Sequence, residues 1–112
     1  MPNNSETISA VFHSLADPTR RAVIERLSEG PAAVGELARS FNMALPSFMQ
    51  HLSVMEECML VKSYKTGRVR IYHLVPKQLK LAEHWMTEQR SIWEKRLDQL
   101  DNFLYKLKEK EK

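Results

Sequence analysis

The sequence predicts a mainly α-helical fold with a small β-hairpin, in the form of a winged helix-turn-helix with a long C-terminal helix. Three observations carry this prediction. Two short amphipathic segments meet at a three-residue corner, residues 42–44. A basic segment rich in β-branched residues then turns at Gly67. From Lys77 to the end of the sequence there is neither glycine nor proline, which favours one long helix.

The composition indicates one small domain. The 112 residues are 43% hydrophobic, and 17 basic against 14 acidic residues leave a net charge of only +3. We therefore expect a single domain over residues 1–112. The one cysteine, Cys58, excludes an intramolecular disulfide. No apolar run reaches the roughly 18 residues of a membrane span or resembles a signal peptide, so we expect a cytoplasmic protein without a membrane partner.

Helices are expected over residues 6–60, after a polar and loose start at residues 1–5. The first helix has apolar residues at helical spacing, namely Ile8, Val11, Phe12 and Leu15. Asp17-Pro18 starts the second helix, because the carboxylate can accept backbone N–H bonds and proline suits a first helical turn. Gly30-Pro31 is expected to end that helix.

Residues 35–58 fit a helix-turn-helix. Two helical turns over residues 35–41 lead into the corner, and Leu45-Pro46 starts the second helix. The apolar stripe that this helix is expected to bury consists of Phe48, Leu52 and Met55. Small and amide-bearing side chains on the opposite side are typical of a helix that recognises DNA.

Residues 61–75 are expected to form a β-hairpin, the wing. A two-stranded ribbon is unstable alone, so the hairpin must lie against the helices. Six basic residues and no acidic one occur between Lys62 and Lys80. Such a concentration of positive charge favours a polyanionic partner.

Residues 77–110 are the predicted dimerisation helix. About 33 helical residues extend about 50 Å, which is longer than the core of so small a domain can cover. We expect its apolar face, together with the first helix, to meet a second copy of the chain. The predicted dimer interface comprises Ile8, Val11, Phe12, Trp85, Met86, Trp93, Leu97, Leu100 and Leu104. Trp85 and Trp93 could instead line an effector pocket.

Four segments together resemble the ArsR (arsenic-repressor-like) family of winged-helix transcriptional regulators. They are His13-Ser-Leu-Ala-Asp-Pro-Thr-Arg-Arg-Ala-Val-Ile-Glu-Arg-Leu, Gly35-Glu-Leu-Ala, Pro46-Ser-Phe-Met-Gln-His-Leu and Gly67-Arg-Val-Arg. The order and spacing of all four make the resemblance specific. It implies a homodimeric repressor whose two recognition helices enter successive major grooves of a palindromic operator. The family commonly has glycine where this chain has Met59, so we expect a different exit from the recognition helix.

Metal sensing is not expected from this resemblance. The cysteine pair of metal-sensing family members corresponds here to Ala33 and Gly35. On the last helix His84 lies four residues before Glu88, but no second histidine completes a tetrahedral site. We therefore expect neither a metal nor a cofactor, and we interpret Cys58 as a small buried hydrophobic residue rather than a redox switch.

The candidate DNA-contacting residues lie on the recognition helix and at the wing. They are Ser47, Met49, Gln50, His51, Ser53, Lys65, Thr66, Arg68 and Arg70. Met49 and His51 could instead be partly buried. Arg20 and Arg21 could add a contact to the DNA backbone, or Arg20 could pair with Glu25 or Glu29.

The sequence thus predicts a homodimeric regulator that binds double-stranded DNA. No spacing typical of a catalytic site occurs among the four histidines, so we do not expect an enzyme. The alternative is a winged-helix module that uses the basic wing to bind protein or RNA. The sequence does not identify the operator, the regulated genes or a small-molecule effector.

Overall fold

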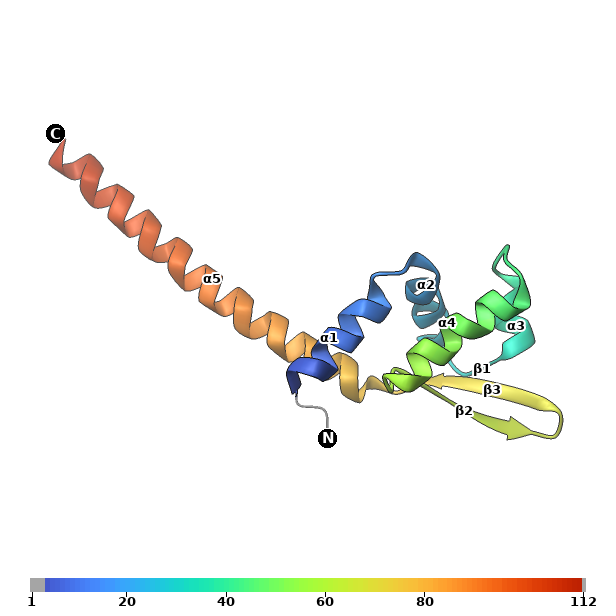
Figure 1. Cartoon of the computed structure of the whole chain (residues 1–112). Helices are drawn as coiled ribbons and strands as arrows, with labels where there is room; N and C mark the ends of the chain where they lie inside the picture. The colour runs from blue at the N-terminus through green and yellow to red at the C-terminus, as the bar shows by residue number, and fades with distance from the viewer. Residues whose placement is uncertain (1–3, 112) are drawn as a thin grey trace. The chain divides into compact units, whose positions relative to one another are not determined.

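The structure is a computed structural model that describes residues 4–111 (Figure 1). The chain forms two compact units that divide between Ala82 and Glu83. Its elements are α1 (Asn4–Leu15), α2 (Pro18–Leu27), β1 (Ala32–Ala33), α3 (Val34–Arg39), α4 (Leu45–Glu57), β2 (Val61–Thr66), β3 (Val69–Leu74) and α5 (Pro76–Lys110). The mainly α-helical winged fold with a long last helix is as predicted.

The first helix begins earlier than predicted. Asn4 and Ser5 belong to α1, so the expected loose start at residues 1–5 is wrong for these two residues. Residues 1–3 lie outside the described residues. The start of α2 is confirmed, because Pro18 opens the helix and the carboxylate of Asp17 accepts the backbone N–H of Arg20 at 3.0 Å. That hydrogen bond is the main reason that the pKa of Asp17 lies below its ordinary value.

The predicted apolar stripes form one core in the first unit. Phe48, Leu52 and Met55 of α4 are fully buried, as expected for the inward face of the recognition helix. Around them pack the buried residues Val11, Val23, Leu27, Ala32, Leu37, Leu60, Val61, Tyr72 and Ala82. The two helices of the helix-turn-helix are therefore anchored by the same core that supports the wing.

The wing belongs to a three-stranded sheet rather than to the predicted two-stranded ribbon. The strand order is β1-β3-β2 and both pairings are antiparallel. Ala32 and Ser63 both pair with Tyr72 of the central strand. Burial raises the pKa of Tyr72, and the nearby charge of Glu56 raises it further. Strand β1 thus attaches the wing to the segment that leads into α3.

The exit from α4 also differs from the sequence-based expectation. Met59 has a φ of 64°, which is the left-handed conformation that glycine usually adopts at this position. The expectation of a different exit was therefore wrong, because this chain keeps the left-handed cap and places a methionine in it.

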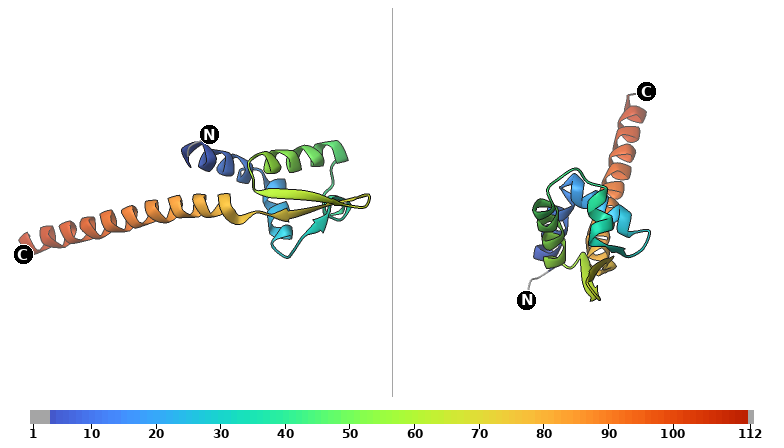
Figure 2. Two further views of the ribbon diagram at one scale, coloured as in Figure 1. Left: turned by 90° about the horizontal axis from the view of Figure 1, so that it is seen from below. Right: turned by 90° about the vertical axis from the view of Figure 1, so that its right-hand side faces the viewer.

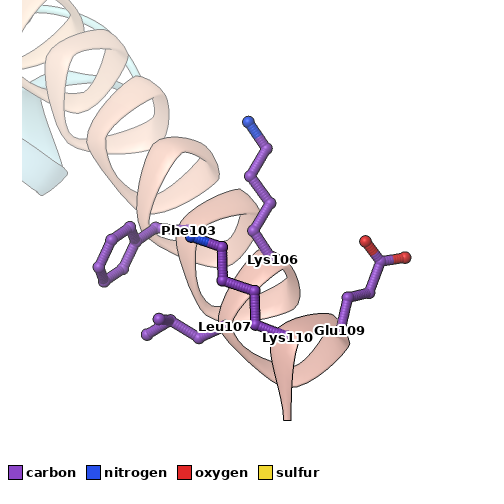
Figure 3. A pocket seen from close by; sticks show the side chains of 5 residues that line it. All are labelled: Phe103, Lys106, Leu107, Glu109 and Lys110. Carbon is purple, nitrogen blue, oxygen red and sulfur yellow. The ribbon is translucent and has the colours of Figure 1, made fainter. Parts of the chain in front are cut away.

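The first residues of the last helix belong to the core of the first unit. Leu79 packs against the core and Ala82 is buried, both in the first unit. In the second unit, none of the residues described from 83 to 111 is buried. Near the end of the helix, Phe103 and Leu107 line an open hollow together with Lys106, Glu109 and Lys110 (Figure 3). Within residues 4–111, no helix has the length and apolar character that a bilayer crossing requires.

Candidate nucleic-acid interface

The recognition helix α4 lies alongside the wing. Strand β2 leaves the C-terminal end of α4 and runs back next to it, and the two elements are in contact (Figures 1 and 2). The wing tip at Gly67 therefore lies at the same end of the first unit as the N-terminal part of α4.

Over its first three turns α4 exposes uncharged polar side chains, next to the exposed Leu45 at its start. Ser47, Gln50 and Ser53 are exposed, so their side chains can reach a ligand in solution. Met49 is half-buried and packs against the core, which favours the structural interpretation of that residue. Serine and glutamine can donate and accept hydrogen bonds, as base edges in a major groove require.

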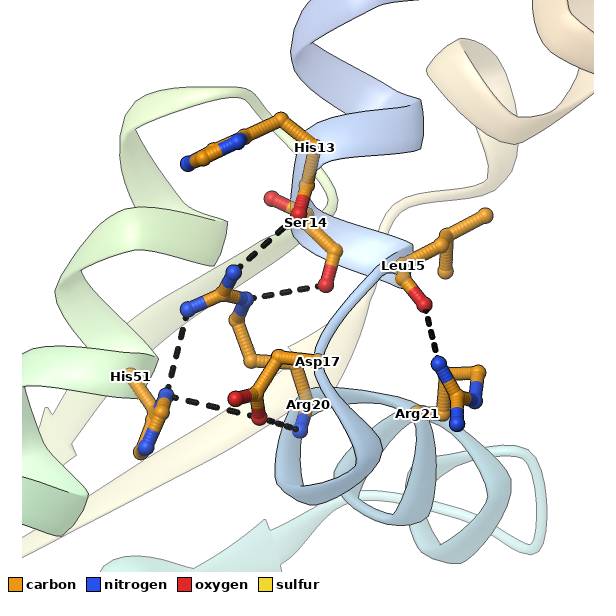
Figure 4. A network of polar contacts seen from close by, with 7 residues as sticks. All are labelled: His13, Ser14, Leu15, Asp17, Arg20, Arg21 and His51. Atoms are coloured by element: carbon orange, nitrogen blue, oxygen red, sulfur yellow. Dashed lines mark hydrogen bonds and ion pairs between the residues drawn. The ribbon is translucent and has the colours of Figure 1, made fainter.

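His51 is less accessible than the other candidates on α4. Its side chain is 23% exposed, and its Nδ1 atom lies 3.2 Å from Nη1 of Arg20 and 3.7 Å from Oδ2 of Asp17 (Figure 4). The recognition helix is thus joined by polar contacts to the corner between α1 and α2.

Arg20 and Arg21 cap the C-terminus of α1. Arg20 donates to the carbonyl oxygen of Ser14 at 2.9 Å and to that of His13 at 3.1 Å. Arg21 donates to the carbonyl oxygen of Leu15 at 2.7 Å. Cations at a helix C-terminus satisfy free carbonyls and oppose the helix dipole. The guanidinium of Arg20 therefore stabilises the end of α1. It does not pair with Glu25 or Glu29, which was one of the alternatives left open by the sequence.

The candidates at the wing are exposed, and all but Thr66 are basic. Lys65, Thr66 and Arg68 lie at or beside the tip, and all three are exposed. Arg70 is oriented by a relay, in which its Nη1 donates to the hydroxyl of Ser63 at 2.9 Å. That hydroxyl in turn donates to Glu56 of α4, also at 2.9 Å. The relay couples the wing to the recognition helix.

Arg39 is a further basic residue near the wing that the sequence interpretation had not included. It lines an open hollow of about 490 Å³ between the start of α3 and the wing, together with Arg68 and Arg70. Sequence alone offered no signal for this proximity, because it depends on the pairing of β1 with β3.

The predicted dimer residues divide into exposed and buried ones. Ile8 and Phe12 are half-buried on α1, whereas Val11 is fully buried. Val11 therefore belongs to the core of the chain itself, and its assignment to a dimer interface is corrected. The predicted residues on α5 are all exposed large hydrophobic side chains: Trp85, Met86, Trp93, Leu97, Leu100 and Leu104.

Comparison with known proteins places this architecture in a family. Residues 15–63 match a model described as a helix-turn-helix domain. SdpR, a transcriptional repressor of Bacillus subtilis, is 30% identical over 76 residues, which cover 68% of this chain and 84% of SdpR. A crystal structure of the ArsR family transcriptional regulator RHA00566 is 46% identical, covers 84% of this chain and 97% of its own, and superposes with a TM-score of 0.77. The chain belongs to the ArsR family of transcriptional regulators.

A second curated relative extends the comparison. The HTH-type transcriptional regulator Rv2034 of Mycobacterium tuberculosis is 48% identical over 65 residues, covering 58% of this chain and 61% of Rv2034. The chain thus matches less than two thirds of the length of that relative. The relatives named in these comparisons are transcriptional regulators, and the matched residues of this chain form a helix-turn-helix domain.

The side chains that could bind a metal are dispersed over the described residues. Among residues 4–111, no three His, Cys, Asp or Glu side chains gather into a group that could hold a metal ion. His84 and Glu88 form an exposed contact of 2.9 Å along α5. Cys58 is half-buried, and its Sγ lies 3.1 Å from the hydroxyl of the fully buried Ser14.

Proposed function

We propose that the protein is a homodimeric, sequence-specific DNA-binding repressor that occupies a palindromic operator. One observation carries the proposal, namely that the uncharged polar side of α4 and the basic wing tip lie at the same end of the first unit. This function requires a compartment that contains DNA, in agreement with the cytoplasmic location expected from the sequence.

Helix α4 and the wing have different roles in binding DNA. Ser47 and Gln50 face the bases, because a helix fits the major groove and an amide can bond adenine at two atoms. Lys65, Arg68 and Arg70 bind phosphates, which supply affinity without sequence information. Since α4 contains neither lysine nor arginine, most of the electrostatic attraction comes from the wing.

Dimerisation supplies the second half of the recognition surface. In α5 the exposed apolar residues Trp93, Leu97 and Leu100 recur at intervals of four and three residues. An unpaired stripe of this kind is covered when it packs against the same stripe of a second helix. Two copies then present two recognition helices to an operator with two-fold symmetry.

The lack of positive charge on α4 also suits the alternative of a protein- or RNA-binding module. Selection of duplex DNA from a random-sequence pool separates the two functions. The repressor predicts enrichment of an inverted repeat with half-sites about one helical turn apart. Recovery of no common sequence would reject the proposal, and a parallel selection from random RNA would test the alternative directly.

A control selection shows whether α4 carries the specificity. A Gln50→Ala variant is expected to enrich a related repeat with weaker preference at one position in each half-site. No small-molecule effector is assigned, since nothing in the described residues identifies its chemistry.

A further inference from the structure

One polar cluster ties the recognition helix to the corner between α1 and α2. It consists of His51 on α4 and of Asp17 and Arg20 at the corner (Figure 4). We infer that Arg20 is a positioning residue for DNA recognition, which holds the ring of His51 in the tautomer that offers an N–H donor to DNA from its outer nitrogen, Nε2. This inference rests on the proposed DNA-binding function.

The direction of the Arg20 guanidinium is set independently of His51. Its Nε donates to the carbonyl oxygen of Ser14 at 2.9 Å, and its Nη2 donates to that of His13 at 3.1 Å. Because the guanidinium is planar and rigid, two bonds to the backbone determine where its third nitrogen points. That third nitrogen, Nη1, points to the imidazole of His51.

The contact between Arg20 and His51 determines the ring proton. Nη1 lies 3.2 Å from Nδ1, and arginine can only donate hydrogen bonds. Nδ1 must therefore accept, and in a neutral imidazole the proton then resides on Nε2. Figure 4 shows this second ring nitrogen on the side of the ring that faces away from Arg20 and Asp17.

Asp17 does not compete effectively for the same ring nitrogen. Its Oδ2 lies 3.7 Å from Nδ1, which is too long for a hydrogen bond. The same oxygen accepts the backbone N–H of Arg20 at 3.0 Å and so caps α2. The shorter contact of Nδ1 is with the guanidinium, at 3.2 Å, so that contact sets which ring nitrogen accepts a hydrogen bond.

The consequence for DNA binding follows from the position of His51. It is adjacent in sequence to Gln50 on the outward side of α4, and its side chain retains 23% exposure. An Nε2–H group can donate to a phosphate oxygen or to an acceptor on a base edge. Without Arg20, the ring is free to exchange tautomers or flip, so the donor is offered only part of the time.

The tautomer can be measured in the free protein by long-range proton–nitrogen correlation of the His51 ring. We expect the Nε2–H form alone in the wild type and a mixture of forms in Arg20→Met. Arg21→Met is the matched control, because Arg21 caps the same helix through Leu15 and its side chain lies away from His51 (Figure 4). A wild-type ring protonated at Nδ1, or a ring unchanged by Arg20→Met, would overturn the inference.

A double-mutant cycle then tests the link to DNA. The probe is a duplex recovered by wild-type selection. Arg20→Met should weaken binding about tenfold, as expected for a displaced hydrogen bond to a charged acceptor, but should have little further effect in a His51→Ala background. Arg21→Met should lower the thermal stability, and any effect that it has on affinity should be the same in the His51 and His51→Ala backgrounds. Equal weakening by Arg20→Met in both His51 backgrounds would show a purely structural role and reject the inference.

The two experiments distinguish a failure of the inference about Arg20 from a failure of the proposed DNA-binding function. If Arg20→Met does not fold, Arg20→Lys replaces it in the cycle, since the ammonium can still cap one carbonyl of α1 but cannot bond all three partners. If selection yields a repeat but the cycle shows no coupling, only the inference fails. If selection yields no sequence at all, the proposed function itself fails.

Discussion

The backbone N–H of Leu60 donates to the carbonyl oxygen of Met55 at 2.9 Å, across the end of the recognition helix. The N–H of Met59 donates to the carbonyl oxygen of Glu56 at 3.1 Å, which completes a Schellman motif. Leu60 and Met55 are both fully buried, so the motif also joins two core side chains. This relationship fixes the direction in which the chain enters the wing.

Substitution of Met59 tests the strain at this cap. The φ of 64° costs a residue with a Cβ atom about 1 kcal/mol relative to glycine. We expect Met59→Gly to be more stable than Met59→Ala. Urea denaturation should give it a free energy of unfolding about 1 kcal/mol higher. Both variants lose the same methionine side chain, so the comparison isolates the backbone. A less stable glycine variant would contradict the left-handed cap.

Asp17 should make the stability of the protein dependent on pH. Its pKa is lowered in the folded state, mainly by the hydrogen bond from the Arg20 backbone, relative to an ordinary value of 3.8. The stabilisation is therefore complete above pH 3.8 and is lost as the pH falls through the lower folded-state pKa. Asp17→Asn should be less stable than the wild type at pH 6, and the difference in unfolding free energy should shrink in acid. If the difference in unfolding free energy between the two proteins is the same at pH 6 and in acid, the Asp17 carboxylate does not stabilise the helix as a cap.

Gln50 and Arg68 are expected to affect DNA binding in different ways. Gln50→Ala should reduce the preference for the selected duplex over an unrelated one, because it removes a hydrogen bond to a base. Arg68→Ala should weaken both duplexes about equally and reduce the salt slope by about 0.9 for each phosphate that the arginine neutralises. Titrations at several salt concentrations measure both effects, and the opposite assignment of the two effects would refute the proposed division of labour.

The apolar face of α5 gives a test of dimerisation. Leu100→Glu places a charge on the exposed stripe, whereas Asn102→Glu makes the same charge change on the opposite side of the helix. Removing a buried leucine from each of the two copies should weaken the dimer roughly 100-fold or more, and Asn102→Glu should have little effect. Analytical ultracentrifugation over a concentration series measures both dimer constants. If the two variants weaken the dimer equally, the apolar face of α5 is not the dimer interface.

Most of the fold followed from local patterns. Asp17-Pro18 marked a helix start because capping depends on residues close in sequence, and the stripe of α4 marked its inward face. Strand β1 was missed because its two alanines have no strand pattern of their own. They become a strand only by pairing with Ile71 and Tyr72, which lie about forty positions later in the chain.

The exposed residues of the candidate site could be predicted from the sequence, but the contacts that orient them could not. The exposure of Gln50 follows from the helical period. The inward orientation of Arg20 could not be predicted, because its partners belong to the C-terminus of one helix and the side of another. The same holds for the relay from Arg70 through Ser63 to Glu56, which requires the register of the hairpin and its packing on α4.

The mass of the protein bound to its selected duplex tests the central claim most directly. Sedimentation equilibrium at low micromolar concentration should give a free protein of twice the chain mass, and a complex that contains two chains for each inverted repeat. A monomer in both states, or one chain on each repeat, would contradict a dimer that presents two recognition helices to one operator.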